Sequence, residues 1–311
     1  MNERLDPFIV DHQFFQEAQK ELQLCYDSFG RTPDPRCTPI LGPSGSGKST
    51  MVKDYIASLV GGSPTEKLVI YIETPSYPSA RGFASKVLNA IGDPMYDRGT
   101  VVQMTVRIVD LLEKLGTRLL IFDEFHNLVD KESAKLSYAA SDWLKGLINE
   151  AKIPTVIVGL ERCREIFIIN EQLQRRFTEA YVMEPFYWKR TETQNMLKGF
   201  LKALQQRYTF AAGLEIHEHE VAFRFYCATG GLVGYIMSIV REAARLATVD
   251  SVPITMDHLA TGYLTAVCNN RLVKINPFTD QNSSRIEAAL SVVEGSQKAG
   301  ERKSRKQHRP R

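Results

Sequence analysis

The stretch GPSGSGKST, residues 42–50, decides how the rest of the chain is interpreted. It fits the pattern Gly-x-x-x-x-Gly-Lys-Ser/Thr at Gly42, Gly47, Lys48 and Ser49. Glycines let the backbone curl so that successive N–H groups point at one anion, and a helix that follows adds the positive end of its dipole. The stretch therefore predicts a phosphate-binding loop, or P-loop.

The residues on either side of this loop strengthen the prediction. A short apolar run at 37–41 predicts a strand before it, and apolar residues with helical spacing from Met51 to Val60 predict a helix after it. The bare pattern arises by chance in roughly one chain in a hundred of this length, and the flanks lower that figure. We expect Lys48 to reach the β- and γ-phosphates and the Ser49 hydroxyl to bind Mg²⁺. The expected nucleotide-binding residues of the loop are Gly42, Pro43, Ser44, Gly45, Ser46, Gly47, Lys48, Ser49 and Thr50.

A second motif, LLIFDE at residues 119–124, places two acids after four apolar residues. Ligands of α/β sheets bind beyond the carboxyl ends of the strands. We expect Asp123 to hold Mg²⁺ through water and Glu124 to orient and deprotonate the attacking water. Many strands end in acids, so the motif gains its weight from the P-loop on the same predicted sheet. His126 and Asn127 follow, either as a polar turn or as a link between nucleotide state and a partner surface.

Apolar runs and helical patterns alternate over the first part of the chain. Nearly continuous apolar runs are typical of strands in a parallel sheet covered on both faces, and they occur at 68–73, 118–124 and 155–160. A short strand is expected at 181–183, and helices are expected at 80–91, 101–115 and 133–151. After about Trp188 only helical patterns remain, at 190–205, 216–228, 231–247 and 255–267. The predicted fold class is α/β, a parallel sheet with helices on both faces, followed by a small all-helical lid domain.

This pattern divides the chain into four parts. They are an N-terminal helical segment, an α/β nucleotide-binding domain, a helical lid domain, and a linker with a basic disordered tail, at 1–36, 37–187, 188–270 and 271–311. The chain carries a net charge of +3, yet residues 295–311 hold seven Lys or Arg and one Glu, so the body is mildly acidic. Such a tail either neutralises phosphates or merely keeps the protein in solution.

Composition excludes several other classes of protein. No apolar run approaches the ~20 residues needed to cross a bilayer, and the N-terminus MNERLDPF lacks the apolar stretch of a secretory signal. Five cysteines, far apart and without a CxxC pair, argue against a disulfide framework or a zinc site. We therefore expect a cytoplasmic protein with reduced thiols and no membrane partner.

The order of motifs resembles the TniB family of transposon AAA+ ATPase subunits, a family similar to TnsC and to the phage Mu B protein. The resemblance runs from about residue 8 to residue 268. The two motifs already described are shared by many ATPases, whereas the runs GLER, QLQRRF and GGLVG are typical of this narrower group. The residues that carry it are GPSGSGKST, LLIFDEFHNL, TVIVGLERC, EQLQRRF, EPFYWKRTET and GGLVGYI.

The resemblance implies a role that composition and periodicity do not show. Members of the family bind ATP with Mg²⁺ and assemble as homo-oligomers, rings or helical filaments, on double-stranded DNA without strong sequence specificity. They present the target to a DDE transposase, with a TniQ-like targeting protein as a further implied partner. The chain is thus expected to be an ATPase that regulates transposition.

The family pattern also implies roles for basic residues. An arginine finger acting on the nucleotide of a neighbouring subunit is expected in EQLQRRF, at Arg175 or Arg176, with a slight preference for Arg176 because it directly precedes Phe177. Both arginines are otherwise surface residues at a helix end. DNA contacts are expected from the segment that precedes the second motif, whose basic residues are Lys86, Arg98 and Arg107. The alternative is that these three residues are solvated positions on helices.

Two departures from the family pattern predict slow hydrolysis. The end of the fourth predicted strand carries Gly159 where many AAA+ proteins have a polar sensor, and the lid run offers Gly234 where many have an arginine. The polar groups that usually sense the γ-phosphate are thus reduced, which fits a switch or timer better than a mechanical motor. The alternative function is an AAA+ or STAND-type signalling ATPase that acts on a protein partner without DNA.

Overall fold

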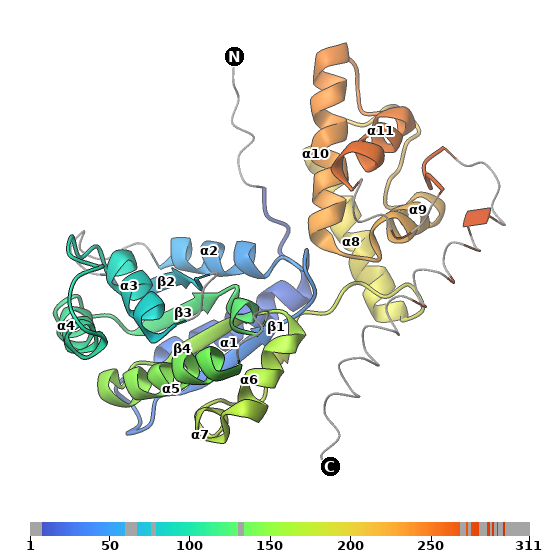
Figure 1. Cartoon of the computed structure of the whole chain (residues 1–311). Helices are drawn as coiled ribbons and strands as arrows, with labels where there is room; N and C mark the ends of the chain where they lie inside the picture. The colour runs from blue at the N-terminus through green and yellow to red at the C-terminus, as the bar shows by residue number, and fades with distance from the viewer. Residues whose placement is uncertain are drawn as a thin grey trace. The chain divides into compact units, whose positions relative to one another are not determined.

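The computed structural model describes residues 8–59, 67–75, 79–129 and 134–267, and a few positions between 272 and 295 (Figure 1). The chain forms two compact units. One comprises Phe14–Met183, and the other comprises Met1–Gln13 together with Glu184–Arg311. The α/β unit therefore starts within the segment that we expected to be separate, and it ends at Met183 rather than at residue 187.

The α/β unit is built on a five-stranded parallel sheet. The strands match the predicted runs to within two residues and lie in the order β2-β3-β4-β1-β5. Strand β4 thus separates β1, which leads into the P-loop, from β3, which ends at Asp123. The strands are β1 (Cys37–Leu41), β2 (Val69–Glu73), β3 (Leu119–Asp123), β4 (Thr155–Gly159) and β5 (Tyr181–Val182).

Helices and short turns connect these strands. Helices α3 and α4 both lie between β2 and β3, and each begins with a side-chain cap, from Ser79 and from the capping box of Thr100 and Gln103. The α-helices of this unit are α1 (Gln13–Ser28), α2 (Lys48–Ser58), α3 (Ala80–Ile91), α4 (Val101–Lys114), α5 (Ala134–Ala151), α6 (Arg164–Ile169) and α7 (Glu171–Gln174). Two 3-10 turns, η1 (Phe125–Leu128) and η2 (Glu161–Cys163), follow β3 and β4.

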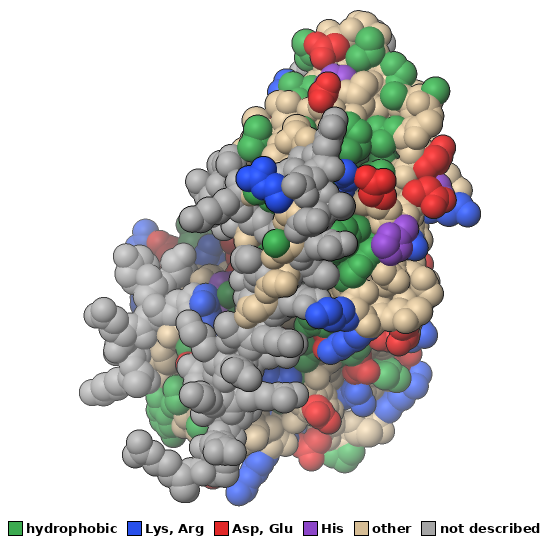
Figure 2. Space-filling model, turned by 90° about the vertical axis from the view of Figure 1, so that its right-hand side faces the viewer, with side chains coloured by type: hydrophobic (Ala, Val, Ile, Leu, Met, Phe, Trp, Pro, Cys, Tyr) green, Lys and Arg blue, Asp and Glu red, His purple; other side chains and the backbone are tan. Residues whose placement is uncertain are grey.

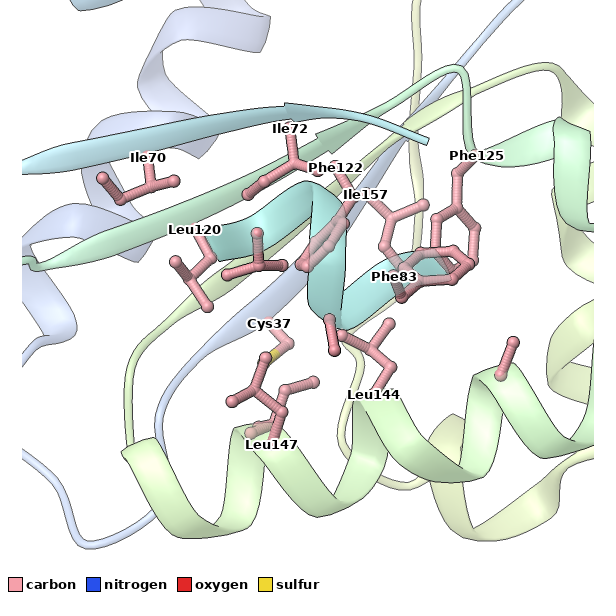
Figure 3. Close-up of a cluster of buried hydrophobic side chains, with 14 of the residues drawn as sticks. Cys37, Ile70, Ile72, Phe83, Leu120, Phe122, Phe125, Leu144, Leu147 and Ile157 are labelled. Atoms are coloured by element: carbon pink, nitrogen blue, oxygen red, sulfur yellow. The ribbon is translucent and has the colours of Figure 1, made fainter. Parts of the chain in front are cut away.

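Successive side chains of β1 point to opposite faces of the sheet, and each face is covered. Cys37 joins a buried apolar cluster with side chains of α3 and α5, such as Phe83 and Leu144 (Figure 3). Thr38, on the other face, accepts a hydrogen bond from the Cys25 thiol of α1 at 3.3 Å. Fully burying a large apolar side chain such as Phe83 or Leu144 contributes about 1.5–3 kcal/mol. The sheet is therefore covered on both faces, as the near-continuous apolar strands predicted.

The second unit is helical, also as predicted. Its helices are α8 (Thr191–Arg207), α9 (His219–Thr229), α10 (Val233–Asp250) and α11 (Met256–Ala266). The turn before α10 places the backbone of Gly231 against that of Phe186, whose N–H donates to the Gly231 carbonyl at 3.0 Å. A Cβ at Gly231 would lie 2.0 Å from the Phe186 oxygen, so only glycine fits there. This contact joins the EPFYW and GGLVG runs.

The lid continues beyond the predicted boundary at residue 270. The guanidinium of Arg224 on α9 donates to the Pro277 carbonyl at 2.6 Å, and the Phe278 ring packs edge-on against Phe225 at 5.0 Å between centroids. Phe278 and Ile286 are both buried. The chain after α11 therefore returns to the lid, whereas the basic stretch 296–311 lies outside the described residues.

Cys25, Cys37, Cys163 and Cys227 are buried, and Cys268 lies outside the described residues. Within the described part of the chain, no group of three or more His, Cys, Asp or Glu is placed to hold a metal ion by itself. No single described helix is long and apolar enough to cross a bilayer; only α9 and α10 taken together, with a 110° bend between them, meet that test of length and composition.

Candidate functional site

The P-loop leaves β1 at Leu41 and enters α2 at Lys48. Gly42 donates its N–H to the Gly159 carbonyl at 3.1 Å, and a Cβ on Gly42 would lie 2.6 Å from the Met183 oxygen. Gly47 caps α2 in the left-handed region with a φ of 92°. The loop glycines are therefore required by close backbone approach and by a turn that other residues adopt only with strain. The N-terminal end of α2 opens onto this loop.

Lys48 is buried within the loop. Its ammonium donates to the carbonyl of Pro43 at 2.7 Å, to that of Gly42 at 2.9 Å and to the Ser46 hydroxyl at 3.3 Å. Burial lowers the pKa of Lys48, and the nearby carboxylates of Asp123 and Glu124 act in the opposite direction. The structure thus brings the predicted lysine and the two predicted acids into one site. A triphosphate would replace the loop oxygens as the partner of this ammonium.

Asp123 ends β3 with a fixed carboxylate. Its side chain is 1% exposed, and its two oxygens accept from the Tyr71 hydroxyl at 2.8 Å and from the Glu124 N–H at 2.7 Å. Tyr71 comes from β2, one strand outward. Sequence reasoning missed Tyr71, since its hydroxyl reaches Asp123 only after the strands pair. A carboxylate held at the sheet edge near a P-loop suits a hydrated Mg²⁺, because oxygen ligands and retained waters are what this ion prefers.

Glu124 starts the turn that leaves β3. Its backbone is in the left-handed region, with a φ of 53° and a ψ of 34°. Its side chain is 45% exposed, and its Oε2 lies 3.2 Å from Nε2 of His126, which is 14% exposed. Unlike Asp123, Glu124 therefore presents its carboxylate to solvent, where a water molecule can reach it.

The turn after Glu124 is attached to both neighbouring strands. Asn127 donates its amide to the Thr74 carbonyl at 3.0 Å, just beyond β2. On the other side, a Cβ on Gly159 would lie 3.3 Å from the His126 nitrogen and 2.6 Å from the Cys163 sulfur. Gly159 stands where many AAA+ proteins have a polar sensor residue. This position has no room for a larger side chain, because the Cys163 thiol occupies the space.

The two candidate finger arginines lie just after α7 in different surroundings. The Arg176 guanidinium forms an ion pair with Asp34, and its side chain is 32% exposed. Arg175 is exposed, and it has no ion pair among the described residues. The two arginines are thus not equivalent, although the sequence offered them side by side.

The three candidate DNA contacts also differ. The Arg107 guanidinium pairs with Asp93 at 2.6 Å and donates to the Met95 and Arg98 carbonyls, so it holds the connection between α3 and α4. Arg98 is 76% exposed and lies 3.8 Å from Asp97. Lys86 is exposed on α3. Only Lys86 and Arg98 therefore present their charge mainly to solvent.

A parallel sheet with β4 between the P-loop strand and the acidic strand, followed by a helical lid, defines a P-loop ATPase of the AAA+ class. The profile of the family described as "Bacterial TniB protein" matches residues 5–190. This chain belongs to that family.

Similar proteins of known sequence or structure agree with the class. The chaperone protein ClpB of Wolinella succinogenes is 25% identical over 171 residues, which cover 54% of this chain and 18% of ClpB. The crystal structure of Cdc6p from Pyrobaculum aerophilum matches with a TM-score of 0.64 at 14% identity, over 93% of this chain and 82% of that one. The Aeropyrum pernix ORC1 protein in complex with DNA matches with a TM-score of 0.61 at 15% identity, over 82% and 65%. These likenesses show the fold, and the chain spans less than a fifth of ClpB.

Proposed function

We propose that this protein is an ATP-dependent regulator of transposition. It binds ATP with Mg²⁺, hydrolyses it slowly, assembles on double-stranded DNA without strong sequence specificity, and recruits or activates a DDE transposase, with a TniQ-like protein as a further partner. The observation that carries the proposal is the buried Lys48 of a P-loop beside the carboxylates of Asp123 and Glu124, in a member of the TniB family.

The chain's own groups divide the work of the reaction. Backbone N–H groups of the P-loop and the Lys48 ammonium would bind the phosphates, and the Ser49 hydroxyl, together with Asp123 acting through water, would hold the metal ion. When bound there, Mg²⁺ would offset the negative charge that develops on the phosphate oxygens. Tyr71 fixes one oxygen of Asp123 in place. Glu124 accepts the proton of the attacking water, which its exposed carboxylate supports.

DNA binding on this proposal is directed at phosphates. The ORC1 structure with the same fold is a DNA complex, and Lys86 and Arg98 are the predicted contacts whose charges face solvent. On the face drawn in Figure 2, the described acidic and basic side chains are interspersed rather than gathered by sign. Contacts from a few scattered cations would give a modest affinity for DNA. This affinity would fall as the salt concentration rises and would not depend on the base sequence.

Assembly on DNA tests the proposal directly. With a non-hydrolysable ATP analogue at low salt, we expect the protein to form large complexes on random-sequence duplex, measured by electron microscopy and sedimentation. With ADP we expect little assembly, and raising the salt concentration should dissociate the complexes formed with the analogue. Lys86→Ala and Arg98→Ala together should lower DNA affinity, with the exposed Lys20→Ala as a matched control on α1. Absence of DNA binding in every nucleotide state would contradict the proposal, and assembly without DNA would favour a protein-directed signalling switch.

The two arginines after α7 give a separate prediction for the assembled state. We propose Arg175 as the finger because its guanidinium faces solvent, whereas that of Arg176 is paired with Asp34. Arg175→Ala should lower the hydrolysis rate of the assembled protein by about 1,000-fold, as loss of a finger does elsewhere. Arg176→Ala removes only a partly exposed ion pair, so its rate should change by less than about fivefold. Both variants should bind ATP normally.

Mixing subunits shows whether the finger acts on a neighbour. A subunit with Lys48→Ala keeps Arg175 but cannot bind ATP well, and a subunit with Arg175→Ala binds ATP but lacks the finger. A mixture of the two should hydrolyse ATP faster than either alone. If the mixture stayed as slow as its components, or if Arg176→Ala were the slower variant, the assignment to Arg175 would be wrong.

A further inference from the structure

The backbone at Glu124 is unusual for its position. Among described residues other than glycine, positive φ angles occur at Glu124, Lys152 and Ser251. Lys152 follows α5 and Ser251 caps α10, so both end helices, where the left-handed conformation is common. Glu124 instead follows a buried strand. A side chain in this region costs about 1–3 kcal/mol and persists only where the surroundings enforce it.

The consequence of that backbone is a contact between side chains two residues apart. The chain turns sharply at Glu124 into η1, and the His126 ring lies beside the Glu124 carboxylate, with Nε2 and Oε2 3.2 Å apart. In an extended strand, residues two apart share a face but are well separated along it. The turn at Glu124 therefore brings together the proposed base and a largely buried imidazole.

The turn that carries His126 is itself held in place. The backbone nitrogen of His126 lies where a Cβ on Gly159 would come within 3.3 Å, so β4 packs directly on the turn. The next residue, Asn127, is hydrogen-bonded to the Thr74 carbonyl beyond β2. With 14% of its side chain exposed against 45% for Glu124, His126 is the more buried member of the pair. A buried partner with few alternative positions restricts the orientation of a more exposed carboxylate.

We infer that His126 is a positioning residue for Glu124: its Nε2 holds one carboxylate oxygen, which leaves the other oxygen directed at the attacking water. This inference rests on the proposed role of Glu124 as the base. It follows the general arrangement in which a base is oriented by a third group that does not touch the substrate. It also accounts for the strained backbone, since a relaxed strand would part the two side chains.

Kinetics with a binding control test the inference. His126→Ala should lower kcat by roughly 10- to 100-fold, the effect of a small misplacement of a reacting group, while the affinity for a non-hydrolysable ATP analogue stays within about twofold. A matched control is His217→Ala, which removes another histidine lying 3.7 Å from a carboxylate, that of Glu215 in the lid. That control should keep the wild-type kcat.

Conservative variants distinguish positioning from folding. Glutamine places an amide near the position of Nε2, whereas the shorter asparagine does not reach it. His126→Gln should therefore keep most of the wild-type kcat, His126→Asn should lose it as alanine does, and melting temperatures should agree. Equal rates for the glutamine and asparagine variants, or a wild-type kcat for His126→Ala, would overturn the inference.

A double variant separates this inference from the proposed function. In a Glu124→Gln background, His126→Ala should cause no further loss of rate, because the group that it positions has been removed. A further loss as large as that in the wild-type background would show that His126 acts independently of Glu124. Wild-type hydrolysis by Glu124→Gln alone would instead refute the proposed base, whatever His126 does.

Discussion

Replacing Lys48 by alanine should weaken ATP binding by at least about 100-fold. The ammonium is the one buried cation of the loop, and each charge-assisted hydrogen bond to a phosphate is worth about 1.5–3 kcal/mol. Two such bonds account for about 3–6 kcal/mol, and each 1.4 kcal/mol is a factor of ten in affinity. Titration with a fluorescent ATP analogue measures the change, and assembly on DNA should fall with it.

The loss must be separated from damage to the loop itself. The Lys48 ammonium also holds the carbonyls of Gly42 and Pro43, so Lys48→Met, which keeps most of the chain's bulk, is the companion variant. Lys53→Ala, on the exposed side of the same helix, should bind ATP like the wild type. Normal ATP affinity in both Lys48 variants would show that the triphosphate does not sit in this loop.

Replacing Glu124 by glutamine should lower hydrolysis by about 100- to 10,000-fold, the usual contribution of a general base. Binding should remain, since the Glu124 side chain holds neither the P-loop nor Asp123; only its backbone N–H donates to Asp123. Assemblies formed with ATP should therefore persist on DNA for far longer than those of the wild type. Single-turnover hydrolysis and the lifetime of the DNA complex measure the two effects.

A neighbouring acid provides the control. Glu73 ends β2 in register with Asp123, so it lies at the same edge of the sheet, and its side chain is exposed. Glu73→Gln should hydrolyse ATP at close to the wild-type rate. If Glu73→Gln stopped hydrolysis while Glu124→Gln did not, Glu73 rather than Glu124 would be the base.

Much of the fold was predictable because local signals were strong. The apolar runs of β1, β3 and β4 are buried along their whole length, and such runs have few alternatives in an α/β chain. Gly92 ends α3 in the left-handed region, and helical spacing predicted both α3 and α4 to within a residue. The P-loop pattern and the two acids at the end of β3 could be picked out because their chemistry demands particular residue types in a fixed order.

The remainder of the site depends on contacts between distant parts of the chain. The Tyr71 hydroxyl contacts Asp123 only when β2 pairs with β3, and neither apolar run indicates that contact. The pairing of Arg176 with Asp34 likewise joins positions that no local pattern connects. The return of Pro277 and Phe278 to the lid was missed because it depends on contacts with Arg224 and Phe225 of α9, which no local pattern indicates. The approach of His126 to Glu124 needed a backbone angle that sequence patterns do not indicate.

The backbone contact between Phe186 and Gly231 limits which residues can occupy position 231. Even a methyl group at position 231 would collide with the peptide oxygen of Phe186, so a larger residue would require the backbone at one of these two positions to move. The restriction falls on position 231, because the Phe186 atoms that face it belong to the backbone and are present whatever side chain stands at position 186. A glycine at the corresponding position of a relative would therefore reflect a steric limit inside the helical unit, set by the main chain of the EPFYW run.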